Sequence, residues 1–242
     1  MSKDALISRI RTLRDHFTSG AIPRPAQHEV HPDMPASSRE RYLYFTLPVT
    51  INFQRSSPAM WQSAYTTWHD PETQPVFLPE WVAAHSEDEL RAKLTKHKLA
   101  LQPNKHTTIW RTIALTLHEF YSDDPREFLK SVRFDIPTLI SHLQIKHRRR
   151  FPYLSGPKLS NYWPYILSQY TDAQFANVQA LSIIPDTHVI QSSIRLGLVP
   201  ANATSRDVEQ VWRELLKGTD ITPSQLHPVL WHWSRNHFQP AG

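Results

Sequence analysis

The chain has 242 residues, of which 40% are hydrophobic and 11% aromatic, and this composition excludes a globally disordered protein. It contains no cysteine, which excludes disulfides, thiolate catalysis and cysteine-ligated metal or iron–sulfur sites. No apolar run reaches the roughly 20 residues that span a bilayer and no signal peptide is visible, so we expect a cytoplasmic protein. The 27 Lys and Arg residues against 22 Asp and Glu residues leave a net charge of +5, which favours a polyanionic partner without identifying one.

Helical patterns dominate the first half of the chain. Only five glycines occur, and no sustained alternation of apolar and polar residues predicts a sheet. Residues 4–18 have apolar positions at helical spacing, whereas residues 19–40 are rich in proline and predict an extended connection. The apolar run from Tyr42 to Phe53 fits either a buried helix or a strand. Further helices are predicted from Ser57, from the capping-box pattern at residues 86–89, and over the amphipathic residues 107–121.

The second half of the chain is also predicted to be helical. The helix over residues 107–121 stops at an acidic turn, and Pro125 opens a short helix after it. Five more helices are predicted, over residues 136–145, 158–170, 186–197, 205–217 and 222–238. The sequence therefore predicts an all-α protein.

A basic run lies between two of these helices. Lys146, His147, Arg148, Arg149 and Arg150 directly precede the turn that leads to the helix beginning near residue 158. A run of this kind binds a phosphate backbone in nucleic-acid-binding proteins. It is equally typical of a solvated helix end, so both interpretations stay open at this point.

Two charged residues are predicted at the starts of helices. Lys158 follows Gly156 and Pro157, a pair that favours a helix start with proline in its first position. Asp186 follows Pro185 and is predicted to be an N-cap. Lys158 alone is consistent with a surface lysine, and Asp186 alone with a structural cap. Together they are a lysine that can act as a nucleophile and a carboxylate that can stabilise a positive charge, each at the start of a helix.

Several segments resemble one known superfamily in their order along the chain. The segments are Leu47–Gln54, Leu101–Tyr121, Asp123–Leu129, Phe151–Lys158, Pro185–Gly197 and His227–His237. They resemble the helix-hairpin-helix DNA glycosylases, in particular the endonuclease III and adenine-mismatch branches, over residues 42–238. The resemblance lies in the order of the segments, because no single one of them is specific.

The resemblance implies a DNA glycosylase, either with or without lyase activity at the abasic site. Lys158 would attack C1′ of the sugar to form a Schiff base, and Asp186 would stabilise the sugar cation. The implied fold is all-α and two-lobed, with a cleft between the lobes. Residues 1–40 would pack on the C-terminal lobe, residues 41–150 would form a helical-bundle lobe, and residues 151–242 would carry the hairpin, the aspartate helix and the closing helices.

The resemblance also implies the contacts with DNA. Gln54, Tyr153 and Trp163 would line the base pocket or enter the duplex, although core packing explains the aromatic residues equally well. The implied contacts with the DNA backbone are Arg148, Arg149, Arg150, Gly156, His188 and Arg195. The expected partner is double-stranded DNA carrying a damaged or modified base, bound by a monomer without a cofactor or a membrane.

The chain departs from the pattern of the superfamily in three respects. The hairpin usually reads glycine, hydrophobic residue, glycine, but here Leu154 takes the first glycine position and Ser155 the hydrophobic position, and a positive φ there would be strained. The interval between Lys158 and Asp186 is longer than in the bacterial enzymes for oxidised pyrimidines, and residues 168–177 look like an insertion. The iron–sulfur cysteines of the two branches are absent.

Two other functions remain open, whereas the sequence argues against catalysis by a bound metal ion. The protein could be a DNA-binding member that has lost turnover, or an N-glycosidase acting on a free modified nucleoside or nucleotide. His227, His232 and His237 recur every five residues, which rotates each of them by about 140° from the last on a helix, so they cannot converge on one metal ion. No metal site is therefore predicted.

Overall fold

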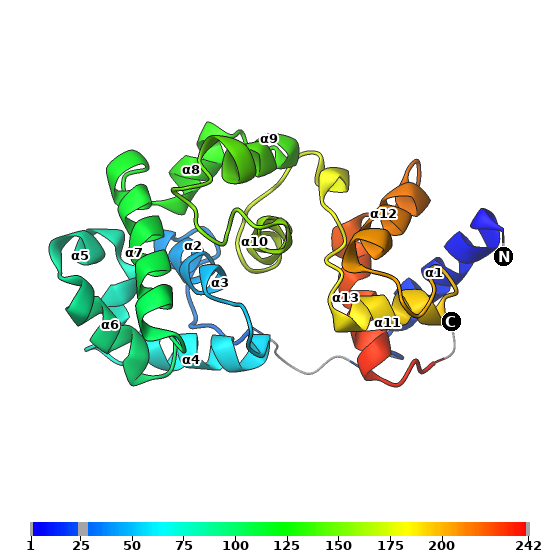
Figure 1. Cartoon of the computed structure of the whole chain (residues 1–242), viewed down its shortest axis with the longest axis horizontal. Coiled ribbons are helices and arrows are strands. Elements are labelled where there is room, and N and C mark those ends of the chain that lie inside the picture. Colours follow the sequence, from blue (N-terminus) through cyan, green and yellow to red (C-terminus); the bar gives the residue numbers. More distant parts are fainter. Residues whose placement is uncertain (1, 24–28, 241–242) are drawn as a thin grey trace. The chain divides into compact units, whose positions relative to one another are not determined.

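A computed structural model describes residues 2–23 and 29–240 (Figure 1). The predicted all-α class is confirmed, since these residues form helices and turns with no strand and with only an isolated bridge between Asp135 and Ala176. The chain divides into two compact units. We call residues 1–26 with 178–242 the terminal unit and residues 27–177 the central unit.

The terminal unit is a helical bundle built from both ends of the chain. Its core includes the fully or almost fully buried side chains of Ile10, Leu13, Val189, Trp212 and Trp233. Helices α1 and α11 both pack against α13, and α11 also contacts α12. Its elements are α1 (Lys3–Thr18), the short turn η3 (Val178–Ala180), α11 (Thr187–Arg195), α12 (Ser205–Leu216) and α13 (Pro223–Arg235).

Helix α12 shows how local sequence defines these elements. Thr204 caps it, and Asp207 returns the contact to the Thr204 backbone, which completes a capping box. Val208, Trp212 and Leu215 recur at helical spacing and form the buried face. The indole N–H of Trp212 donates to the Ser193 hydroxyl at 2.8 Å, so its burial leaves no polar group unsatisfied.

The central unit contains the remaining helices. Its longest helix, α7, packs against α5, α6 and α3, and Figure 1 shows α5 and α6 lying against α7. Its elements are α2 (Arg39–Tyr44), α3 (Leu47–Thr50), α4 (Ser57–His69), η1 (Gln74–Phe77), α5 (Pro79–Ala84), α6 (Glu87–Lys96), α7 (Pro103–Phe120), α8 (Pro125–Ser131), α9 (Ile136–Ser141), the π-helical turn η2 (His142–Lys146) and α10 (Pro157–Tyr170).

The ambiguous apolar run from Tyr42 to Phe53 is helical. It contains the end of α2 and all of α3, and Tyr44, Leu47 and Val49 are completely buried. A segment that is apolar on every side is buried on every side, so its sequence has no period that separates helix from strand. The Tyr44 hydroxyl donates to the Val30 carbonyl at 2.7 Å, which supplies a partner inside this core.

The boundary between the units lies later in the chain than the sequence indicates. The sequence places a boundary after residue 150, but α10 packs on α3 and α9 and belongs to the central unit. Residues 2–23 belong to the terminal unit with the C-terminal helices, whereas residues 29–40 belong to the central unit. Part of the predicted extended connection, residues 24–28, lies outside the described residues.

The segment that looks like an insertion is tied to the central unit. The Asp172 carboxylate accepts a hydrogen bond from the Tyr42 hydroxyl at 2.7 Å, and the Ala176 N–H donates to the Phe134 carbonyl at 3.0 Å. Asn177 donates to Asp135 at 2.6 Å. These contacts connect residues far apart in sequence, and they explain why the boundary falls after Asn177. No helix of the described chain is long and apolar enough to cross a membrane.

Candidate functional site

Lys158 is an exposed residue in the first turn of α10. Gly156 is the N-cap and Pro157 occupies the first helical position, as the sequence predicts. No side chain among the described residues caps this helix, so the amide groups of its first turn stay available to a ligand. An exposed lysine beside unpaired backbone donors can approach a phosphodiester and its sugar.

The hairpin turn before α10 differs from the expectation. The residue with positive φ is Tyr153, at 62°, and not Leu154 or Ser155. Leu154 is completely buried, and the Gly156 N–H donates to the Tyr153 carbonyl at 2.8 Å. A β-carbon at Gly156 would meet that carbonyl at 3.1 Å, which is a tight contact. The strain expected at Leu154 and Ser155 is therefore absent, and Tyr153 carries the left-handed conformation instead.

Tyr153 and Gln54, two predicted DNA-contacting residues, are linked through Phe53, the neighbour of Gln54 in the chain. The Tyr153 ring stacks on Phe53 with centroids 4.4 Å apart and an interplanar angle of 11°. The Lys105 ammonium lies 4.7 Å from the Phe53 centroid and 5.0 Å from that of Tyr153. Gln54 has a φ of 54° and accepts a hydrogen bond from the Gln102 side chain at 3.2 Å. The stack therefore joins the hairpin to the loop between α3 and α4.

No sequence pattern assigned Phe53 and Lys105 to the site. Lys105 stands ahead of the amphipathic pattern of α7, and Phe53 ends the apolar run. Their neighbours along the chain could have indicated a turn, but only the tertiary structure brings Tyr153 against them. The cation and the two rings form a partly exposed platform, which suits stacking with a base.

Trp163 belongs to the core and not to the base pocket predicted for it. Its side chain is 1% exposed, and its indole N–H donates to the Thr46 hydroxyl at 3.1 Å. Its ring lies parallel to that of Phe128, with centroids 6.1 Å apart. The helical phase explains the difference, because Trp163 is five residues after Lys158 and thus faces another side of α10.

The basic run lines an open cavity of about 580 Å³. Arg148 and Arg149 are exposed, and the Arg150 guanidinium lies 3.7 Å from the centroid of the Phe120 ring. The side chain of Ile145 is 77% exposed beside these cations. The cavity is lined by Ile145, Lys146, His147, Arg148, Arg149 and Arg150. Its positive charge suits contact with phosphate groups.

Asp186 is the N-cap of α11, as predicted. Its Oδ1 accepts a hydrogen bond from the Val189 N–H at 2.9 Å, and its side chain is half-buried. His188 in the first turn is already engaged, because its Nδ1 lies 3.1 Å from the Ser234 hydroxyl and its ring packs against Trp231. The Asp186 carboxylate is therefore held in one orientation while part of it remains accessible.

Arg195 ends the same helix. It is exposed, and its guanidinium lies 5.8 Å from the centroid of the Phe238 ring. Lys158 belongs to the central unit, whereas Asp186, His188 and Arg195 belong to the terminal unit. Each of the two candidate catalytic residues thus occupies the start of a helix in its own unit.

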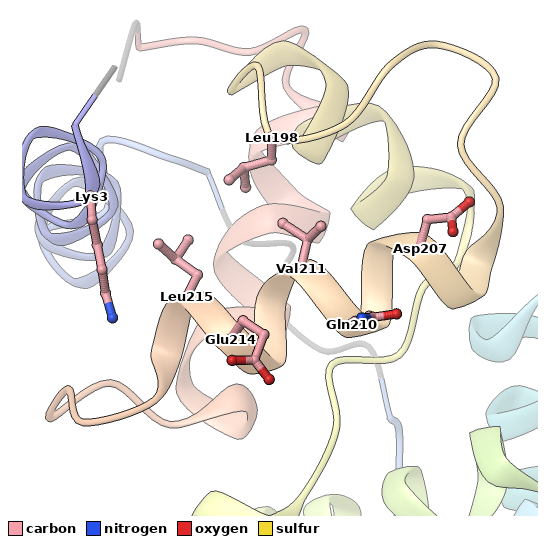
Figure 2. A pocket seen from close by; sticks show the side chains of 7 residues that line it. All are labelled: Lys3, Leu198, Asp207, Gln210, Val211, Glu214 and Leu215. Carbon is pink, nitrogen blue, oxygen red and sulfur yellow. The ribbon is translucent and has the colours of Figure 1, made fainter.

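The terminal unit has a second cavity of about 450 Å³ (Figure 2). Figure 2 shows Leu198, Val211 and Leu215 on one side of it, with the carboxylates of Asp207 and Glu214 along α12. Lys3 of α1 and Gln210 complete the lining. Carboxylates repel a phosphate backbone, so this cavity does not fit DNA.

Metal ligands do not cluster in the part of the chain that the structure describes. No group of three or more His, Asp or Glu side chains there has an arrangement that could hold a metal ion. His232 packs beside Phe17, with ring centroids 5.5 Å apart, and it forms no group with His227 and His237 that could hold a metal ion. The site is thus described by its lysine, carboxylate and aromatic groups.

Comparison with known proteins identifies the fold. No family model and no curated protein matches the sequence. A solved structure of a trapped covalent intermediate of endonuclease III with DNA, in an estranged-adenine complex, is similar to this chain with a TM-score of 0.61. The match has 16% sequence identity and covers 100% of this chain and 90% of that chain. The chain therefore has an endonuclease III-like fold along its whole length.

Proposed function

We propose that this protein is a DNA glycosylase that removes a damaged or modified base from double-stranded DNA. Lys158 is the nucleophile, and Asp186 stabilises the sugar cation. The observation that carries the proposal is the endonuclease III-like fold over the whole chain. The lysine in the first turn of α10 and the aspartate that caps α11 support it, because they follow each other in the order that the resemblance implies.

The chemistry assigns a separate task to each residue. The target base leaves the helical stack, and the neutral amine of Lys158 attacks C1′ of its sugar. The bond between C1′ and the base breaks, its electron pair leaves with the base, and a proton from the amine is released. The carboxylate of Asp186 lowers the energy of the positive charge that develops on the sugar. Opening of the sugar ring then gives an imine, which is either hydrolysed or cleaves the strand by elimination.

The proposed DNA interface of the central unit combines charge and stacking. Arg148, Arg149 and Arg150 contact phosphates, and the first turn of α10 after Gly156 provides backbone donors. Tyr153 and Gln54 face the duplex from adjoining loops. In the terminal unit, Arg195 is the proposed backbone contact, and His188 contributes through the first turn of α11.

The proposal is tested by trapping the imine. Purified protein is incubated with duplexes that each carry one damaged or modified base, and with a duplex that carries a preformed abasic site, in the presence of borohydride. We expect a covalent adduct with the wild type and none with Lys158→Gln. The matched control is Lys98→Gln, an exposed lysine of the central unit outside the proposed interface, which should form the adduct normally.

A pair of Asp186 variants separates charge from helix capping. Asparagine caps a helix about as well as aspartate, so Asp186→Asn should melt like the wild type while base release falls about 100-fold. Asp186→Ala loses the cap as well, and its stability should fall by about 1 kcal/mol. Equal base release by Asp186→Asn and the wild type would remove Asp186 from the mechanism.

The other outcomes identify the two alternative functions. Binding to duplex DNA without base release or an adduct would indicate a DNA-binding protein without turnover. Release of a base only from free nucleosides or nucleotides would indicate an N-glycosidase of another substrate class. Base release without trapping would support a glycosylase that does not use Lys158 covalently.

A further inference from the structure

Glu29 lies among tyrosine side chains of α10. The Tyr170 hydroxyl donates to its Oε2 at 2.6 Å, and the Tyr162 hydroxyl lies near the carboxylate. Burial raises the pKa of Glu29, and these two hydroxyl groups partly offset the rise. The charge of Glu29 in turn acts on Tyr165, whose pKa is raised mainly by burial. Sequence patterns gave no indication of this cluster, because Glu29 precedes α10 by more than a hundred residues.

The backbone that carries Glu29 is fastened by its neighbours. The Val30 carbonyl accepts a hydrogen bond from Tyr44 at 2.7 Å, and the His31 ring packs edge-on against both Phe45 and Tyr170. These contacts fix the segment without help from the Glu29 side chain. The Glu29 carboxylate is therefore held in place by its surroundings, but it is not needed to hold this segment on the central unit. A side chain that binds a ligand is expected to be supported in this way.

Tyr162 and Tyr165 continue the helix face that begins with Lys158. Residues four apart on a helix are neighbours, so Tyr162 lies one turn from Lys158, and Tyr165 lies close to the following turn. The Tyr162 hydroxyl lies 3.4 Å from the Ser57 hydroxyl, which accepts a hydrogen bond from Asn52 at 3.2 Å. The cluster is thus connected to the loop that carries Gln54, a proposed DNA contact. All of these groups belong to the central unit.

The partial exposure of the cluster distinguishes it from core packing. Glu29, Tyr162, Tyr165 and Tyr170 are all half-buried, whereas Trp163 and Ile166 of the same helix are almost completely buried. Aromatic faces with a few convergent polar groups are typical of a small-molecule site. A carboxylate can accept from an N–H group, and a phenol hydroxyl can donate to a carbonyl.

We propose that Glu29, Tyr162 and Tyr165 form the site that recognises the edge of the extruded base, with Glu29 as the specificity-determining residue. This inference rests on the proposed function. The complementary edge has a ring N–H next to a carbonyl, so that Glu29 accepts from the N–H and a tyrosine hydroxyl donates to the carbonyl. Uracil, hypoxanthine and 8-oxoguanine have such an edge. Adenine and cytosine present an unprotonated ring nitrogen to the carboxylate and are rejected.

The test compares bases with and without the ring N–H. Base release is measured under single-turnover conditions from duplexes that carry uracil, hypoxanthine or 8-oxoguanine. For each of these substrates, a control duplex carries the same base methylated at that ring nitrogen. Borohydride trapping on a preformed abasic site is measured in parallel, because this substrate has no base to recognise. The variants are Glu29→Gln and Tyr165→Phe, and the matched control is Glu119→Gln, an exposed glutamate of the same unit.

We expect the wild type to release at least one of the three bases and its methylated counterpart about 10-fold to 100-fold more slowly. Glu29→Gln should lower the ratio of base release to abasic-site trapping by a similar factor and weaken the discrimination against the methylated base. Tyr165→Phe, which removes only a hydroxyl group, should change the ratio in the same direction. Glu119→Gln should behave as the wild type does.

Two sets of results would overturn the inference. The cluster does not recognise the base if Glu29→Gln and Tyr165→Phe keep the wild-type ratio of base release to abasic-site trapping. The same conclusion follows if methylated and unmethylated bases are released equally fast. In both cases, trapping at the abasic site still supports the glycosylase. If the wild type neither releases a base nor forms an adduct at an abasic site, the proposed function fails and the inference fails with it. Melting curves identify a variant that is merely unfolded, and Tyr165→Phe then decides the question.

Discussion

His106 is a buried histidine at the start of α7, and its ring packs edge-on against Phe53 with centroids 4.9 Å apart. Its side chain is 1% exposed, and its Nδ1 accepts a hydrogen bond from the Leu101 N–H at 3.2 Å. Its Nε2 has no hydrogen-bond partner among the described residues. Burial, followed by the charges of Arg55 and Lys105, lowers the pKa of His106 to about 4. The folded protein therefore holds this ring neutral.

The neutral state of His106 predicts a loss of stability in mild acid. Because the pKa is lower in the folded state than the ordinary value of about 6.5, the unfolded chain takes up the proton first as the pH falls. Stability should decrease between pH 6.5 and pH 4, by about 3 kcal/mol in total from this group. Urea unfolding at pH 7.5 and pH 4.5 measures this difference in the free energy of unfolding.

The comparison with a non-titrating variant isolates the contribution of His106. His106→Asn retains an acceptor for the Leu101 N–H but does not titrate in this range. For each protein, the free energy of unfolding at pH 4.5 is compared with that of the same protein at pH 7.5. The difference between the two pH values should be smaller in His106→Asn than in the wild type. An equal difference would show that other groups cause the loss, for example the carboxylates that titrate in the same range.

At the scale of elements, the starts of helices were predictable from short stretches of sequence. The structure confirms the helix starts at Ser57 and Pro125, the capping box at Ser86 and the N-cap at Asp186. Caps depend on contacts within three or four residues, so the local sequence contains the necessary information. The predicted start at Thr107 was wrong by one turn, because α7 begins with Pro103 in its first position.

The end of the predicted helix over residues 136–145 also differs from the structure. After Ser141 the helix continues as the π-helical turn η2, which ends at Lys146. A wider turn inserts a residue into the helical register, and hydrophobic periodicity over one turn cannot reveal it.

The arginine segment after η2 predicts the salt dependence of DNA binding. Each arginine that neutralises a phosphate contributes about one unit to the slope of log affinity against log salt concentration. Arg148→Ala combined with Arg149→Ala should therefore make the slope shallower by about 2. Affinity is measured by fluorescence anisotropy with a duplex that carries a stable abasic-site analogue.

A control in the terminal unit makes this prediction specific. Arg206→Ala removes an exposed arginine of α12 that is not proposed to contact DNA, and the slope should not change. If the two arginines of the central unit can be removed without any change in slope, the cavity beside Ile145 does not bind the backbone.

At the scale of the whole molecule, the N-terminal helix and the last helices share one core. Ile10 and Leu13 of α1 pack with Trp212 and Trp233 in a cluster formed only by residues of the terminal unit. Arg11 also pairs with Asp220 at 2.7 Å, although both side chains are largely exposed and the pair contributes little. The unit is therefore held by apolar burial between segments far apart in sequence.

Because each unit has its own core, we expect a destabilising substitution in one unit to reduce protection from hydrogen exchange mainly in that unit. Trp212→Ala removes a side chain that is 1% exposed, and substitutions of this kind destabilise by about 3–5 kcal/mol. Hydrogen exchange should accelerate in α1, α11 and α13, and much less in α7 of the central unit. Trp110→Ala, within α7, should give the opposite pattern. Equal acceleration in both units for either variant would show that they unfold as one.

The sequence by itself determined the helical class, most helix starts and the two residues proposed for catalysis, since these depend on composition, on periodicity and on caps a few residues long. Only the tertiary structure decided that Trp163 is core, that Tyr153 lies against Phe53, and that Glu29 meets Tyr170 of α10. Such contacts join residues that the chain separates widely. No local pattern encodes them, because they arise from the packing of whole helices.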